Sequence, residues 1–150
     1  MADEAFLASL GPLVRAMVVA RDEWWIIGSA AVALHGGDPG TIADVDVITS
    51  RRDLDALHET LPLTDTPESG KPMFASERFG RWSELELDVE FMTGLKLLER
   101  GSWQPIVPRT RCEICFGNLA LFVPEKAELI ELLHRFGRDK DLRRAATLGG

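Results

Sequence analysis

Residues 28–47 read GSAAVALHGGDPGTIADVDV, and the interpretation of the whole chain starts from this stretch. Gly28 and Ser29 open a short run of helical composition, for which Ser29 is the expected N-cap. A loop of Gly, Asp and Pro follows, and Asp44 and Asp46 then stand one residue apart in an apolar segment typical of a strand. Two like charges in an otherwise apolar strand require a physical explanation.

Strand geometry supplies one explanation for the two aspartates. Side chains alternate along a strand, so Asp44 and Asp46 share one face, while Val45 and Val47 share the opposite face. The two carboxylates repel each other unless a cation lies between them, and hard divalent cations prefer such oxygen ligands. The pair therefore predicts a metal site.

A second acidic segment, ELELDVEF at residues 84–91, has the same alternation. Its acids share one face and its apolar residues share the other. If this strand neighbours the first, three or four carboxylates converge on one patch, as a two-metal phosphoryl-transfer centre requires. The acids are Glu86, Asp88 and Glu90, and the apolar residues are Leu85, Leu87, Val89 and Phe91.

Gly28 and Ser29 supply a complementary feature. Glycine lets the backbone approach a phosphate closely, the start of a helix presents unpaired N–H groups, and the serine hydroxyl can add a hydrogen bond. The alternative explanations are structural: a helix cap for the Gly-Ser pair, and a polar sheet edge for the acids. In combination, the elements favour a phosphate-binding and metal-binding site.

These motifs resemble the nucleotidyltransferase superfamily typified by DNA polymerase β. Its signature is Gly-Ser or Gly-Gly at a helix start, an Asp-x-Asp strand, and a third acid on a later strand, matched here by Gly28-Ser29, Asp44-Val45-Asp46 and Asp88. Residues 122–142, FVPEKAELIELLHRFGRDKDL, are also similar to the segment that follows the core in small bacterial members. The resemblance covers roughly residues 22–142.

The resemblance implies an α+β fold with a mixed, mostly antiparallel sheet flanked by helices and a C-terminal helical segment. It implies that Asp44, Asp46 and Asp88 bind Mg²⁺ or Mn²⁺, that Asp88 activates the attacking hydroxyl, and that Gly28 and Ser29 bind the nucleotide. The implied reaction moves a nucleoside monophosphate from a nucleoside triphosphate to a hydroxyl of a small molecule or a protein. Possible accessory residues are Glu90, Thr41, His35 and Arg81.

An alternative prediction is a weakly active or inactive fold of this kind that serves as a binding partner, for example in a toxin–antitoxin pair. The loop before Asp44 has no basic residue, and a lysine common in the later helix has no clear counterpart. Cations would have to come from elsewhere in the chain. The candidate cations are Arg51, Arg52, Lys71, Arg78 and Arg81.

Composition limits the other functional classes. The 150 residues predict a single domain, with a core at about 22–123 and a helical segment at about 124–147. The formal net charge of −7 disfavours a long nucleic acid as the partner, and the charges of residues 135–144, RFGRDKDLRR, alternate as on a solvated helix face. Without a signal-like or membrane-spanning segment, a soluble cytoplasmic protein is expected. A purely structural domain, with acids that are only solvated, is the third alternative.

The remaining elements follow from periodicity and turn residues. Cys112 and Cys115 lie three apart on an expected strand and therefore on opposite faces, which predicts two inert cysteines. A hairpin is expected at 111–123, turning at Gly117-Asn118. Helices are expected at 3–20, 51–61 and 94–103, and one or two helices at 124–148. A loop is expected at 62–72, and further strands are expected at 23–28, 41–50, 73–82 and 83–93.

Overall fold

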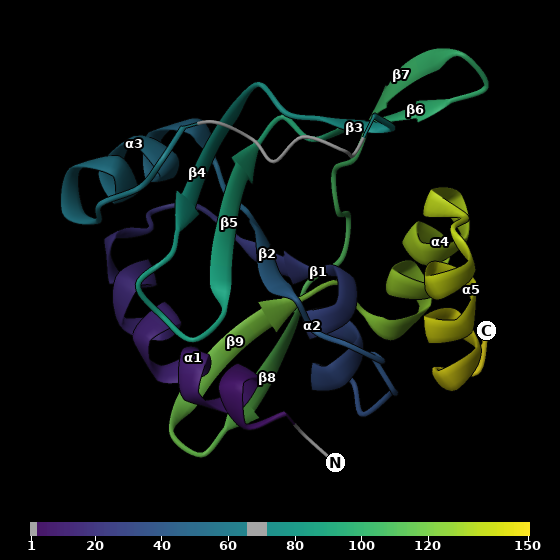
Figure 1. Cartoon of the computed structure of the whole chain (residues 1–150), viewed down its shortest axis with the longest axis horizontal. Helices are drawn as coiled ribbons and strands as arrows, with labels where there is room; N and C mark the ends of the chain where they lie inside the picture. Colours follow the sequence, from purple (N-terminus) through teal and green to yellow (C-terminus); the bar gives the residue numbers. More distant parts are fainter. Residues whose placement is uncertain (1–2, 66–71) are drawn as a thin grey trace.

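The computed structural model describes residues 3–65 and 72–150 (Figure 1). Most of the loop predicted at 62–72, including Lys71, falls outside these ranges. The helices are α1 (Glu4–Ala16), the 3₁₀ helix η1 (Met17–Val19), α2 (Gly28–Leu34), α3 (Arg51–Thr60), α4 (Lys126–Phe136) and α5 (Asp139–Thr147). The strands are β1 (Trp25–Ile27), β2 (Asp44–Ile48), β3 (Phe74–Ala75), β4 (Arg78–Trp82), β5 (Asp88–Thr93), β6 (Lys96–Glu99), β7 (Ser102–Pro105), β8 (Cys112–Phe116) and β9 (Leu119–Val123).

The main sheet has the strand order β1-β2-β5-β4. Strands β2 and β5 run parallel, and the β1–β2 and β4–β5 pairs are antiparallel. The structure thus confirms a mixed, mostly antiparallel sheet with flanking helices. No helix in the described ranges is long and apolar enough to cross a membrane.

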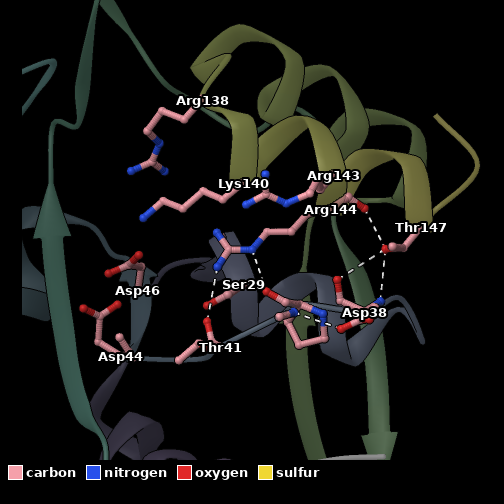
Figure 2. A pocket seen from close by; sticks show the side chains of 14 residues that line it. Ser29, Asp38, Thr41, Asp44, Asp46, Arg138, Lys140, Arg143, Arg144 and Thr147 are labelled. Carbon is pink, nitrogen blue, oxygen red and sulfur yellow. Dashed lines mark hydrogen bonds between the residues drawn. The ribbon is translucent and has the colours of Figure 1, made fainter.

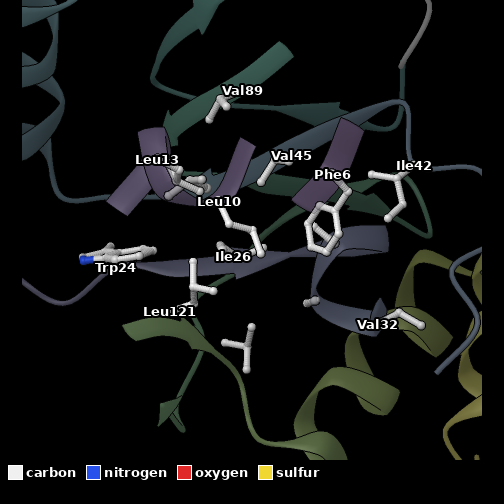
Figure 3. Close-up of a cluster of buried hydrophobic side chains, with 14 of the residues drawn as sticks. Phe6, Leu10, Leu13, Trp24, Ile26, Val32, Ile42, Val45, Val89 and Leu121 are labelled. Atoms are coloured by element: carbon white, nitrogen blue, oxygen red, sulfur yellow. The ribbon is translucent and has the colours of Figure 1, made fainter. Parts of the chain in front are cut away.

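The alternation predicted for β2 is also confirmed. Val45 and Val47 are fully buried, while Asp44 and Asp46 on the opposite face are only partly buried. Figure 3 shows Val45 and Val89 among the apolar side chains contributed by α1, β1 and β9. Burial of this face fixes which way the two aspartates point, because a one-residue shift would place both of them in the core.

The prediction of a helix at 94–103 is wrong, because this segment forms the β6–β7 hairpin. Glu99 pairs with Ser102, and the two residues between them, Arg100 and Gly101, both have positive φ angles, 51° and 77°. Positive φ at both central positions defines the type I′ turn that suits tight hairpins. The hairpin at 111–123 is confirmed as β8 and β9, with Phe116 paired to Leu119 across the predicted turn.

The C-terminal segment forms two helices, as the sequence allowed. Helices α4 and α5 lie side by side, and both contact α2 (Figure 1). Gly137, in the left-handed conformation with φ of 71°, ends α4 and turns the chain into α5. The N-cap of α2 is Ile27, two residues before the predicted Ser29, so Ser29 lies in the first turn of the helix.

One buried carboxylate anchors α4 to the segment between β7 and β8. Glu128 is 5% exposed and accepts hydrogen bonds from the backbone N–H of Arg109 (2.7 Å) and Thr110 (2.8 Å). Burial raises the pKa of Glu128, but the hydrogen bonds from the Thr110 side chain and the two N–H groups lower it by more. The pKa of this carboxyl is therefore below its ordinary value.

Glu128→Gln is expected to lower the free energy of unfolding at pH 7 by about 1–3 kcal/mol, because a buried N–H loses its charged acceptor. A lowered folded-state pKa stabilises the protein above the unfolded value of roughly 4.3, and this stability is lost as pH falls through the folded-state pKa. The variant should therefore lose less stability than wild type between pH 6 and pH 3. Denaturant unfolding measures both effects, with the exposed Glu131→Gln as control. Equal acid sensitivity of Glu128→Gln and wild type would contradict this role.

Candidate active site

Three carboxylates from two parallel strands meet at one point of the main sheet. Asp44 and Asp46 lie on β2 and Glu90 lies on β5, and one oxygen from each residue lies within 4.8 Å of the others. The strand register brings them together, since Asp46 is directly opposite Glu90. Glu90 is 4% exposed, whereas the two aspartates are partly buried.

Asp88, the acid expected from the resemblance to complete the triad, lies one pleat repeat before Glu90. It is opposite Asp44 in the register, and its side chain is 45% exposed. Arg81 on β4 lies between the two β5 acids: its Nη2 is 3.0 Å from Glu90, and its Nε is 4.0 Å from Asp88. Within the described residues, the carboxylate that clusters with Asp44 and Asp46 is therefore Glu90.

The donor set fits a hard divalent cation. All three groups offer carboxylate oxygens, which are the ligands that Mg²⁺ and Mn²⁺ prefer. Like charges this close repel each other, and a cation between them would remove the repulsion. The cluster of Asp44, Asp46 and Glu90 is thus a candidate metal site.

A cavity of about 620 Å³ opens beside the two aspartates, and its other wall is basic. Figure 2 shows the helix α5 above the cavity, with Arg138 and Lys140 extending toward the side where Asp44 and Asp46 lie. The cationic lining residues are Arg138, Lys140, Arg143 and Arg144. The charges of this segment were predicted to form a solvated helix face, but they line the cavity that contains the acids.

Two of these arginines are held in place by a buried acid. Asp141 is 1% exposed and accepts from Arg138 at 2.6 Å, and Arg144 lies 3.9 Å from it. Arg144 also donates to the carbonyl oxygens of Pro39 (2.7 Å) and Thr41 (3.2 Å), which joins α5 to the loop before β2. Burial lowers the pKa of the Arg144 guanidinium, and the charges of Asp141 and Asp46 act in the opposite direction.

Gly28 and Ser29 line the same cavity, next to the acids. Gly28 has a φ of +69°, and a Cβ at this position would lie 3.3 Å from Oδ2 of Asp46. The residue thus combines a backbone conformation that favours glycine with close contact to a candidate metal ligand. The approach of a phosphate to the Gly28 backbone stays a prediction.

Gly28→Ala is expected to lower the free energy of unfolding by about 1–2 kcal/mol, because a non-glycine residue is strained at this φ. It should also displace the Asp46 carboxylate and reduce metal binding. Gly117→Ala is the matched control, since Gly117 has a φ of +64° but no neighbour within 4 Å. Thermal unfolding with and without Mn²⁺ separates the two effects. Equal loss of Mn²⁺ binding in both variants would contradict the contact with Asp46.

The accessory residues have different surroundings. Thr41 lines the cavity, and Arg81 pairs with Glu90. The His35 ring lies 2.8 Å from the carbonyl oxygen of Pro124 and is not among the described residues that line the cavity. Two of the arginines that the sequence offers as cations for the site pair with other acids: Arg52 with Asp22, and Arg78 with Asp55. The positive charges beside Asp44 and Asp46 come instead from α5 and its N-cap residue.

The chain has the nucleotidyltransferase fold, with an acidic pair on β2 and a further acid on the parallel strand β5. Comparison with solved structures confirms this fold. The nucleotidyltransferase-fold protein TM1012 from Thermotoga maritima matches with a TM-score of 0.73 and 20% identity, over 99% of this chain and 93% of its own. The lincosamide antibiotic adenylyltransferase LnuA, bound to lincomycin, matches with a TM-score of 0.61 and 13% identity, over 99% of this chain and 98% of its own. ANT(2'')-Ia, in complex with adenylyl-2''-tobramycin, matches with a TM-score of 0.58 and 12% identity, over 95% of this chain and 90% of its own.

Sequence comparisons add no closer relationship. No protein-family model matches the chain, and no curated protein matches it in sequence. At these identities the structural likeness establishes the fold, which agrees with the fold implied by the resemblance.

Proposed function

We propose that this protein is a metal-dependent nucleotidyltransferase that moves a nucleoside monophosphate from a nucleoside triphosphate to a hydroxyl of a small molecule. One observation carries the proposal: in a nucleotidyltransferase fold, two carboxylates of the acid cluster, Asp44 and Asp46, and four cationic side chains line opposite walls of one cavity. LnuA and ANT(2'')-Ia, whose structures contain lincomycin and an adenylylated tobramycin, support a small molecule as the acceptor.

The basic wall of the cavity suits the phosphates of the nucleotide. Lys140 and Arg143 on α5 would bind phosphate oxygens, and Arg138 and Arg144 add positive charge while Asp141 holds them in place. Positive side chains at this position stabilise the charge that develops on the departing pyrophosphate. Gly28 allows the closest approach of backbone to ligand, and the Ser29 hydroxyl can donate a hydrogen bond.

Asp44, Asp46 and Glu90 would hold the divalent cation, which when bound polarises the phosphoryl group and favours the ionised form of the attacking hydroxyl. In the reaction, the acceptor oxygen forms a bond to the α-phosphorus, and the bond from this phosphorus to the bridging oxygen of the β-phosphate breaks. Pyrophosphate leaves, and the hydroxyl proton passes to a carboxylate of the cluster. Asp88, on the same strand as Glu90, is the alternative third acid.

The reason for the binding-partner alternative was the shortage of cations near the acids. Three cations of α5 and Arg138, its N-cap residue, line the cavity, so this reason no longer holds. No other observation on the described residues favours a catalytically inactive protein over an enzyme.

The proposed activity is tested by incubating the protein with each labelled nucleoside triphosphate, Mg²⁺ and a panel of hydroxyl-bearing small molecules. Label should move to an acceptor with release of pyrophosphate, and Asp44→Ala should abolish the transfer. Equal transfer by wild type and Asp44→Ala would contradict the proposal.

Lys140→Met is expected to weaken binding of a Mg²⁺–triphosphate complex by about 10- to 100-fold, because a charge-assisted hydrogen bond to phosphate is lost. Lys140 is exposed, so the variant should remain folded without ligand. Titration calorimetry with a non-hydrolysable triphosphate measures the affinity. The control is Lys126→Met, which removes an exposed lysine at the start of α4. The same affinity for both variants would show that Lys140 does not contact the phosphates.

A further inference from the structure

A second pocket, of about 310 Å³, lies on the other side of the acid cluster. It shares Gly28, Asp46 and Arg138 with the first cavity, so the two spaces meet at these residues. The volume is near the lower limit of about 300 Å³ for small-molecule sites.

The walls of the second pocket are mainly apolar, in contrast to the basic cavity. Strands β3, β4 and β5 and the end of α4 contribute to them, and the rings of Phe74 and Phe136 pack edge to face with centroids 5.1 Å apart. Such a lining favours an apolar ligand, with a few polar groups to orient it. The apolar side chains that carry this argument are Phe74, Phe79, Met92, Leu95 and Phe136.

The three carboxylates divide between the two spaces. Asp44 lines only the basic cavity, Glu90 lines only the apolar pocket, and Asp46 lines both. A triphosphate against α5 and a hydroxyl compound in the apolar pocket would therefore meet at Asp46. This is the position that the transfer of a nucleoside monophosphate requires, because the acceptor oxygen must reach the α-phosphorus.

The charges of the apolar pocket limit the acceptor. Its charged lining residues are Asp46, Glu90 and Arg138, and both carboxylates belong to the candidate metal site. Glu90 also pairs with Arg81, which adds a further cation beside the pocket. A ligand with several positive charges would thus compete with the metal for the same oxygens and face two arginines.

We infer that the second pocket is the acceptor subsite, and that the acceptor is a small, largely apolar molecule with a hydroxyl and at most one positive charge. This inference rests on the proposed function, because the hydroxyl is identified as the group that attacks the nucleotide. It makes Phe79, whose side chain lines only this pocket, a specificity-determining residue.

The test measures binding of two hydroxyl compounds to the whole chain with Mg²⁺ and α,β-methylene-ATP present. The apolar probe is 2-(2-naphthyl)ethanol, followed by its fluorescence, and the cationic probe is 2-deoxystreptamine, followed by saturation-transfer NMR. Wild type should bind the apolar probe at least about tenfold more tightly, as expected for burial of an aromatic ring. Binding of the methylene analogue is measured separately for each protein.

Two substitutions examine the pocket itself. Phe79→Ala should lower the affinity for the apolar probe by about tenfold. Phe79→Leu should lower this affinity by less than about threefold, because leucine retains most of the apolar surface. Ala75→Glu adds a carboxylate at an exposed position in the lining, and should reverse the preference toward 2-deoxystreptamine. Phe116→Ala, an exposed phenylalanine outside both cavities, is the control and should change neither affinity.

The outcomes separate the two proposals. If wild type binds the methylene analogue with Mg²⁺ but prefers 2-deoxystreptamine, or if Phe79→Ala and Ala75→Glu leave both probes unchanged, the acceptor inference is wrong and the proposed function stands. If wild type shows no Mg²⁺-dependent binding of the analogue, the proposed function is wrong, and the pocket is no longer an acceptor subsite. The inference is supported if wild type prefers the apolar probe, Phe79→Ala loses affinity for it, Phe79→Leu retains most of that affinity, and Ala75→Glu prefers 2-deoxystreptamine.

Discussion

Asp46→Asn is expected to lower the rate of nucleotidyl transfer by at least about 10³-fold, because the central acid of the site loses its charge. Asp46 clusters with Asp44 and Glu90 and lies close to the backbone of Gly28. It also lines both the basic cavity and the apolar pocket. Asparagine has almost the same shape, so the fold should remain. Removal of one like charge also relieves repulsion within the cluster.

The measurement for Asp46→Asn is pyrophosphate release under saturating triphosphate, together with the melting temperature. Glu86→Gln is the matched control, since Glu86 is an exposed acid just before β5 and outside the cluster. Wild-type rates in Asp46→Asn, or an equal loss in Glu86→Gln, would contradict the central role of Asp46.

Glu90→Gln is expected to have the second largest effect, a loss of about 10²- to 10³-fold in rate, while Asp88→Asn should lose less than about tenfold. Glu90 is buried and within the carboxylate cluster, whereas Asp88 is half-exposed on the same strand. Neutralising Glu90 also leaves Arg81 without its 3.0 Å ion pair, so the melting temperature of this variant should fall.

Binding of Mn²⁺ distinguishes a lost metal ligand from a loss of stability. Enhancement of water-proton relaxation at a temperature where both variants are folded gives the affinity directly. Glu90→Gln should weaken Mn²⁺ binding and Asp88→Asn should not. The reverse order would restore Asp88 as the third acid, as the resemblance implied.

The acidic pair could be predicted because it depends on local geometry. The two-residue period of a strand places Asp44 and Asp46 on one face, and the full burial of Val45 and Val47 confirms the orientation. The identity of the third acid could not be predicted in this way. The same period places Asp88 and Glu90 on one face, and the register sets them opposite Asp44 and Asp46, respectively. Among the described residues, the side-chain positions bring Glu90 into the cluster.

The basic wall was missed for a different reason. Alternating charges on a helix are usually solvated, and nothing in the sequence shows where α5 packs. A signal was nevertheless present, because Lys140, Arg143, Arg144 and Thr147 follow the i, i+3, i+4, i+7 spacing of one helix face. All four line the cavity, so this face, with no apolar residue, was the indication of a binding surface.

The β6–β7 hairpin was also missed, because a short apolar run does not distinguish strand from helix. The better signal was Gly101, because glycine readily adopts the positive φ that the turn at Arg100-Gly101 requires. This error does not affect the carboxylate cluster, which lies on β2 and β5.

The central claim is that Asp44, Asp46 and Glu90 hold a divalent cation beside a triphosphate bound by α5. A crystal structure with Mn²⁺ and α,β-methylene-ATP tests it most directly, because the anomalous scattering of Mn²⁺ locates the ion independently of the protein. We predict Mn²⁺ in contact with oxygens of all three carboxylates, and phosphate oxygens in contact with Lys140 and Arg143. Mn²⁺ absent from this cluster, or phosphates bound away from α5, would contradict the claim.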